Sequence, residues 1–340
     1  PRSHADPAAD PNSAMAMVRG ARRTHQRMGI TMAPLTMASR VLKGLCRAYV
    51  EQHGVRDVRR KLPLDNGLIN GMLMTPEDAE YGGLRWSWVS YRGVATRACF
   101  ETQFECGMRK DEVSKLTATT ARGAGHLSFA SLVWKIDSQE VTDPTPALLN
   151  SLSEVRGDGV WLRHGVAKND FFGTFFAATP SFLPYRASGT RCAARALRAL
   201  ELLAQVHGAA RKRTPLFGAS PGREFTHKEL EDAFYLLLHR GAGVAVARLS
   251  DYSIHSIRIF VACALLAANV PRPTIKRLLR WRGDESLEIY ARLNDDEWTH
   301  HVRATYVAHV DSAVAGRLGA IGPFDFENLA PAIAQGVAVA

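Results

Sequence analysis

The sequence predicts a mainly helical α+β protein that carries one small antiparallel β-sheet. Apolar residues recur at the spacing of amphipathic helices over most of the chain. Between 126 and 180 the pattern changes to runs rich in Val, Phe and Trp with partial alternation, which is typical of strands. Hydrophobic residues make up 46% and charged residues 22% of the 340 residues, so we expect a folded protein with a substantial core.

The composition narrows the class of partner. The net charge is +10, and an excess of this sign is typical of a protein that binds nucleic acid, although an ordinary basic protein fits the charge equally well. Five scattered cysteines without a CxxC pair argue against a zinc site and favour a reducing compartment, either the bacterial cytoplasm and nucleoid or a nucleus. The most apolar run, 257–270, is too short to span a bilayer, so no membrane partner is expected.

The N-terminal part is predicted to be a basic helical region behind an unstructured lead. Residues 1–13 are rich in Pro, Ala and Asp and are expected to be disordered. Residues 14–57 follow a basic amphipathic pattern with two helices, and a charged, proline-containing segment at 56–65 is the expected linker. Because the chain begins with Pro1 and not Met, we expect that an N-terminal part is missing. The basic side chains expected to bind a polyanionic partner here are Arg22, Arg23, Arg59, Arg60 and Lys61.

The main domain is predicted to span 58–315, with its helices ahead of the sheet. One apolar helix containing Cys99 and Cys106 should break at Gly107, and a second should open near Lys110. Both cysteines are expected in the core. The sheet is predicted to have three antiparallel strands within 126–137, 159–168 and 171–180, the last two joined by a turn at 169–170.

Helices are predicted again after the sheet. An amphipathic helix is expected over 189–208 and a loop over 211–225. Thr226 and Glu229 have the spacing of a capping box at the start of the next helix. Further helices are expected through the apolar run that begins at 250 and on to about 315, and residues 316–340 are expected to be a flexible tail.

The motif HSIR at 255–258 has the composition of a phosphate-binding pair. His255 and Arg258 are three residues apart and therefore share one helix face. An arginine among apolar neighbours is seldom buried without a partner. The planar guanidinium of an arginine can donate two hydrogen bonds to a phosphate, and a titratable imidazole beside it suits the same ligand. For this motif alone, a helix-terminal histidine and an arginine that extends to solvent are the commoner explanation.

Five further side chains fit the same chemistry. Arg109 opens a predicted helix, where backbone N–H groups help an arginine to bind phosphate, and Glu112 could orient its guanidinium from one turn away. Lys168 lies at the tip of the predicted hairpin. Trp281 is followed nine residues later by Tyr290, in a short predicted helix. Taken singly, an ordinary surface ion pair, a solvated lysine and core aromatics are each the commoner explanation.

The order and spacing of these motifs resemble the tyrosine recombinase and phage integrase family. GMRKDEVSKL is similar to its first box, AKND to its lysine-bearing hairpin, HSIR to its HxxR box, and LLRW followed by IY to its final box. The usual histidine of the final box is Trp281 here, as in the Cre-like branch, and Arg280 stands in place of the usual glycine. The resemblance covers roughly 58–315, and 14–53 weakly.

The resemblance implies an enzyme that cleaves and rejoins double-stranded DNA at specific sites through a 3′-phosphotyrosyl intermediate. It implies a catalytic domain over 58–315, the end of a helical core-binding domain before it, a homotetramer in the synaptic complex, and no cofactor or metal. Tyr290 would be the nucleophile, Lys168 the acid for the leaving oxygen and His255 an aid to proton transfer. The catalytic set is completed by Arg109, Arg258 and Trp281 on the phosphate, with Glu112 supporting Arg109.

Three alternatives remain open from the sequence. A type IB topoisomerase would share the tyrosine, arginines and lysine and would relax supercoils without exchanging partners. An inactive DNA-binding relative would keep the fold without the catalytic activity. A basic helical scaffold with chance motifs would have neither the fold nor the activity of the family. The target sequence, the base-reading residues and the choice among mobile-element integrase, resolvase and retrotransposon recombinase cannot be read from the chain.

Overall fold

The computed structural model describes residues 61–120, 126–165, 180–268 and 270–281, together with single positions between 24 and 48. The chain divides into two compact units, Pro1–Leu62 and Pro63–Ala340, and the elements given below belong to the second. Most of the predictions for 1–60, and all of those for 282–340, lie outside the described residues. Within the described part, no helix is long and apolar enough to cross a membrane.

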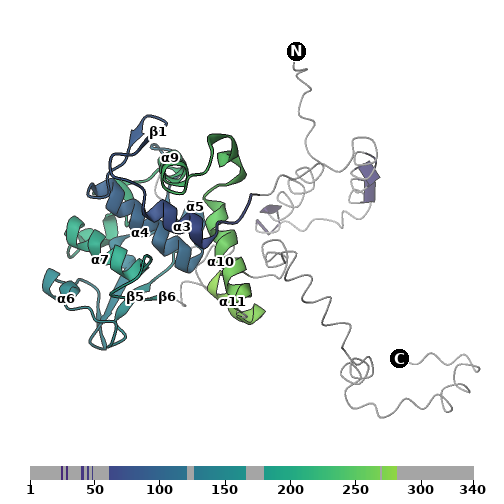
Figure 1. Ribbon diagram of the computed structural model, residues 1–340. Coiled ribbons are helices and arrows are strands. Elements are labelled where there is room, and N and C mark those ends of the chain that lie inside the picture. The colour runs from purple at the N-terminus through teal and green to yellow at the C-terminus, as the bar shows by residue number, and fades with distance from the viewer. Residues whose placement is uncertain are drawn as a thin grey trace, which may run out of the picture. The chain divides into compact units, whose positions relative to one another are not determined.

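Helix α4 (Tyr91–Cys106) is the centre of the second unit. Its N-terminus is capped by Ser90, whose side chain accepts from the backbone N–H of Gly93 at 3.1 Å, and it ends at Gly107. Helices α7 (Ala193–Ala204) and α10 (His255–Ala267) pack on it from two sides (Figure 1). Before it in the sequence come α3 (Asn66–Leu73), β1 (Glu80–Tyr81) and β2 (Leu84–Arg85), and α5 (Lys110–Val113) follows it. The predicted break at Gly107 and restart at Lys110 are therefore confirmed.

The main sheet has four antiparallel strands where the sequence predicted three. Its spatial order is β4 (Gln139–Val141), β3 (Leu132–Ile136), β5 (Gly159–Leu162), β6 (Ser181–Pro184). The prediction missed β4 because Asp137 and Ser138 form the hairpin turn with φ of 48° and 64°, a conformation for which Asn-Gly is the usual signal. The third predicted strand, 171–180, lies outside the described residues except for Pro180, and β6 follows it.

The segment 211–225 is not the plain loop that the sequence predicted. It contains most of α8 (Ala210–Arg213) and a hairpin of β7 (Gly218–Ser220) and β8 (Arg223–Glu224). These elements are too short for a periodic pattern to form. Beyond them come α9 (His227–Leu236), a π-helical turn (Leu237–Gly241), a 3₁₀ turn (Val246–Asp251) and α11 (Arg272–Leu278); α6 (Pro146–Asn150) precedes β5.

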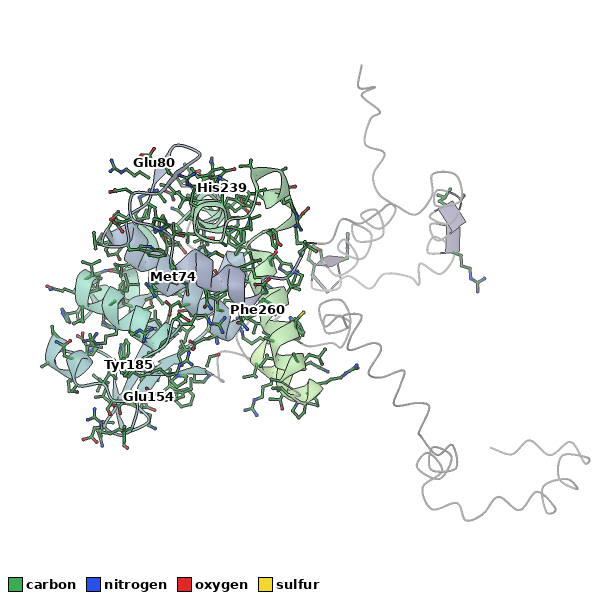
Figure 2. All side chains as sticks on the ribbon, viewed as in Figure 1. Met74, Glu80, Glu154, Tyr185, His239 and Phe260 are labelled. Atoms are coloured by element: carbon green, nitrogen blue, oxygen red, sulfur yellow. The ribbon has the colours of Figure 1, made fainter. Side chains whose placement is uncertain are left out.

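The core lies between α4 and the elements packed around it. Cys99 and Cys106 are both buried, as expected, and burial raises the pKa of Cys106 to about 12, so this thiol is inert at neutral pH. The capping box of α9 is present, with Glu229 accepting from the backbone N–H of Thr226 at 3.0 Å. Figure 2 shows the side chains of these elements, including Phe260 of α10. The guanidinium carbon of Arg191 lies over the Phe260 ring, 5.5 Å from the ring centroid.

Candidate active site

Arg258 connects three parts of the chain that are distant in sequence. Its side chain is only 1% exposed on α10, and its guanidinium donates to the backbone carbonyls of Gly107 and Leu279. The guanidinium carbon also lies 5.3 Å from the ring centroid of Trp281. A buried cation requires such partners, because desolvation without them is costly. Arg258 therefore fixes the end of α4 and the end of α11 against the start of α10.

Gly107 makes this close approach possible. Its φ is 58°, in the left-handed region that glycine occupies without strain. A Cβ atom at this position would collide with the side chain of Leu279, which is itself fully buried. The glycine is therefore required by both backbone conformation and packing.

Gly107→Ala should consequently destabilise the protein more than a glycine replacement that affects the backbone alone. Gly82 is the matched control, because its φ is 60° and nothing lies near its Cβ position. Gly82→Ala should cost about 1–2 kcal/mol for the left-handed conformation. Gly107→Ala should cost about 1–3 kcal/mol beyond that for overpacking. Urea denaturation of the two variants measures the difference, and equal losses would contradict the packing argument.

Arg109 and Glu112 lie at the start of α5, beside the Arg258 contacts. The Glu112 Oε2 atom accepts from the backbone N–H of Arg109 at 2.7 Å. Its Oε1 atom is 3.7 Å from Nη1 of the Arg109 guanidinium, which is too long for a hydrogen bond. The expected support of Arg109 by Glu112 is therefore mainly support of the Arg109 backbone.

A pocket of about 230 Å³ opens beside Arg109 and His255. Its other walls come from Met108 and residues 110–111, from Glu231 of α9, and from 253–254 before α10. Glu231 binds the ammonium of Lys110 at 2.6 Å, and Asp111 lies 3.3 Å from the imidazole of His227, whose pKa burial lowers. The pocket is smaller than a typical cofactor site of roughly 300–1,000 Å³. The size of the pocket, and the presence of Arg109 and His255 in its wall, suit a small anionic group.

His255 is held as a neutral imidazole at physiological pH. Burial lowers its pKa, and the positive charges of Arg258 and Arg109 lower it further. A neutral imidazole can accept a proton, whereas an imidazolium cannot. The environment of His255 therefore suits a proton acceptor beside two arginines.

A third arginine, to which sequence reasoning assigned no role, completes the cluster. Arg280 is 3% exposed, and its Nη2 atom binds Glu112 Oε2 at 2.9 Å. Burial would raise the pKa of Glu112, but the charge of Arg280 and the Arg109 backbone N–H outweigh it and lower the pKa. Glu112 is therefore an anion among three arginines. We call Arg109, Arg258, Arg280 and Glu112 the arginine cluster; the only sequence signal for Arg280 was its place where a glycine is usual.

His164 and Ser181 lie on either side of the segment that contains Lys168. His164 follows β5, Ser181 begins β6, and their side chains hydrogen-bond at 2.7 Å. Burial, followed by the charge of Arg280, lowers the pKa of His164 from 6.5 to about 3. His164 therefore lies within electrostatic range of Arg280.

The buried imidazole of His164 should make stability fall in acid. The unfolded chain binds this proton near pH 6.5 and the folded chain only near pH 3, so stability is complete above 6.5 and is lost as the pH falls between these values. The expected contribution is about 1.4 kcal/mol per pH unit in that window. Urea midpoints of the native chain and His164→Gln between pH 7 and pH 4 should diverge accordingly. Parallel curves would mean that His164 already titrates normally in the folded chain.

The structure brings together five of the residues that the sequence singled out: Arg109, Glu112, His255, Arg258 and Trp281. Lys168 and Tyr290 lie outside the described residues, as do Arg22, Arg23, Arg59 and Arg60. Lys61 is described and belongs to the first unit. The catalytic role of each of these residues stays a prediction.

Comparisons with known proteins find likenesses in structure only. No protein-family model and no curated sequence matches the chain. The chain is similar to a crystal structure of the recombinase XerA, with a TM-score of 0.43 and 11% identity over 87% of this chain and 83% of that chain. It is also similar to the site-specific recombinase XerH bound to a palindromic difH substrate in a post-cleavage complex. For XerH the TM-score is 0.39 and the identity 14%, over 72% of this chain and 53% of that chain. These likenesses are too distant to assign a role to any residue.

Proposed function

We propose that this protein is a site-specific tyrosine recombinase that cleaves and rejoins DNA strands through a 3′-phosphotyrosyl bond at Tyr290. The observation that supports the proposal is the convergence of Arg109, His255 and Arg258 from two helix starts that are far apart in sequence. Arg109 and His255 line an anion-sized pocket, and the charge of Arg258 acts on His255 from the same helix. Two arginines and a neutral histidine are groups that transfer of a phosphodiester requires. The motif order GMRK, AKND, HSIR and LLRW, followed by Tyr290, supplies the remaining groups.

The proposed chemistry needs only protein groups. A phosphodiester gains negative charge as it becomes pentavalent, and Arg109 and Arg258 stabilise that charge. Carbonyl bonds fix the plane of the Arg258 guanidinium, so this donor is oriented before the substrate arrives. His255 accepts the phenolic proton as Tyr290 attacks phosphorus.

The departing 5′ oxygen takes a proton from Lys168, and Trp281 donates its indole N–H to the phosphate. The new phosphotyrosyl ester conserves the energy of the broken bond, so that a 5′ hydroxyl from another strand can reverse the step without ATP. Strand exchange of this kind requires two duplexes and a homotetramer. The basic residues Arg22, Arg23, Arg59, Arg60 and Lys61 would then hold the DNA backbone.

Covalent capture of DNA tests the proposed function. The chain is incubated in EDTA with short duplexes of randomised sequence, each with one nick that lets the short fragment bearing the freed 5′ hydroxyl diffuse away. We expect a DNA adduct that survives denaturing electrophoresis, and sequencing of the captured DNA gives the target site.

The same experiment separates the alternatives. Capture without sequence enrichment, together with relaxation of supercoiled plasmid, would identify a type IB topoisomerase. DNA binding without any capture would identify an inactive DNA-binding relative. Recombination between two copies of an enriched site would establish partner exchange.

A further inference from the structure

We propose that Arg280 is a positioning residue that holds the charge of Glu112 and thereby keeps the Arg109 guanidinium available for the DNA phosphate. The inference rests on the proposed function, because it concerns the same phosphate site. It assigns a role to a side chain that stands where the related motif has a glycine and therefore no side chain.

The contacts of Glu112 carry the first step. Its Oε2 atom receives both strong bonds, from Arg280 Nη2 at 2.9 Å and from the Arg109 backbone N–H at 2.7 Å. The buried Oε1 atom of Glu112 and the buried Nη1 atom of Arg109 have no hydrogen-bond partner among the described residues, although they lie only 3.7 Å apart. The carboxylate is thus held through its other oxygen, just out of bonding distance of the Arg109 guanidinium.

The consequence of removing Arg280 follows from the cost of a buried charge. Glu112 is buried and anionic, so it needs a cation in contact. Arg258 already donates to the carbonyls of Gly107 and Leu279. Arg109 is the nearest guanidinium on the same helix start, and a small rotation would bring it onto Glu112 as a direct ion pair. That pair would draw the Arg109 guanidinium away from the pocket, where it is the proposed donor to the phosphate.

The backbone at Arg280 argues against simple space-filling. Its φ is 54°, a left-handed conformation that costs energy for any residue with a Cβ atom. The side chain is nevertheless buried and paired with a carboxylate 168 residues away. Glycine at position 280 would relieve the strain. The hydrogen bonds from Arg258 to Gly107 and Leu279 would still hold the end of α4 and the end of α11 together. The local structure should therefore survive without Arg280, whereas the charge of Glu112 would lose its partner.

Three variants test the inference in the full chain. Arg280→Gly removes the charge and relieves the backbone, Arg280→Lys keeps a charge, and Arg280→Gly with Glu112→Gln removes both partners. Gln205→Gly is the matched control, because Gln205 is an exposed C-cap with φ of 48° outside the cluster. Two readouts are used: the affinity for inorganic phosphate by calorimetry, and the rate of DNA adduct formation at saturating DNA.

We expect Arg280→Gly to weaken phosphate binding and slow adduct formation by roughly tenfold to a hundredfold, the usual effect of losing a residue that orients a ligand-binding group. The double variant should recover most of both losses, because a neutral amide in place of the Glu112 carboxylate no longer attracts Arg109. Arg280→Lys should be intermediate, and Gln205→Gly should behave as the native chain. A double variant no better than Arg280→Gly, or a native-like Arg280→Gly, would overturn the inference.

The two readouts separate this inference from the proposed function. Adduct formation by the native chain with no effect of Arg280→Gly on either readout would remove the positioning role alone. A native chain without adduct whose phosphate affinity follows the predicted order of variants would remove the transesterase function and keep the positioning role. A folded native chain that binds no phosphate would overturn the positioning role directly.

Discussion

Tyr290→Phe should bind DNA with native affinity and form no covalent adduct with it. The substitution removes only the phenolic oxygen, which is the proposed nucleophile, and leaves the DNA-binding surface and the arginine cluster as they are. Loss of a nucleophile from a covalent catalyst typically costs roughly 10⁵–10⁶-fold in rate. Denaturing electrophoresis after incubation with nicked duplexes measures the adduct, and a mobility shift on native gels measures binding.

Tyr185→Phe is the matched control for this variant. Tyr185 follows β6, is half-buried and lies outside the arginine cluster (Figure 2). It should form adduct at the native rate. An adduct that persists in Tyr290→Phe would mean that another side chain attacks the phosphate, and the assignment of the nucleophile would be wrong.

Arg258→Ala should damage both stability and chemistry. The substitution leaves the buried carbonyls of Gly107 and Leu279 without their donor, at a cost of about 1–3 kcal/mol each. Adduct formation should fall by roughly 10²–10³-fold in the protein that remains folded, as for the loss of one preorganised donor. Urea denaturation and single-turnover adduct formation are the measurements.

Two further variants sharpen this prediction. Arg258→Lys keeps the charge but cannot bond both carbonyls with one planar fork, so it should restore little of either property. Arg85→Ala removes an exposed arginine that pairs with Asp78, and it should unfold at the native midpoint. A stable Arg258→Lys variant with native adduct formation would show that charge alone is needed at this position.

Much of the helical framework follows from local signals in the sequence. The break at Gly107, the restart at Lys110 and the capping box of Thr226 and Glu229 each depend on residues within one or two turns of each other, and all three are present in the structure. HSIR lies at the start of its apolar helix, as its spacing predicts. Local chemistry determines these features, so a single sequence contains them.

The features that the sequence did not predict depend on contacts between distant residues or on unusual turns. β4 depends on a left-handed turn at Asp137 and Ser138, two residues that carry only a weak turn signal. The Arg280–Glu112 pair joins residues 168 positions apart, and His164 acquires its lowered pKa only in the folded chain, through burial and the charge of Arg280. No periodic pattern contains such information. Lys168 and Tyr290 remain predictions from the motif order alone.

The site of covalent attachment tests the central claim most directly. The captured adduct is treated with nuclease and trypsin, and the nucleotide-bearing peptide is sequenced by mass spectrometry. Cleavage after Arg282 and Arg292 releases GDESLEIYAR, which contains one tyrosine, Tyr290, and one other hydroxyl side chain, Ser286. The account predicts a nucleotide 3′-phosphate attached to Tyr290. Attachment at Ser286, or on any other peptide, would contradict it.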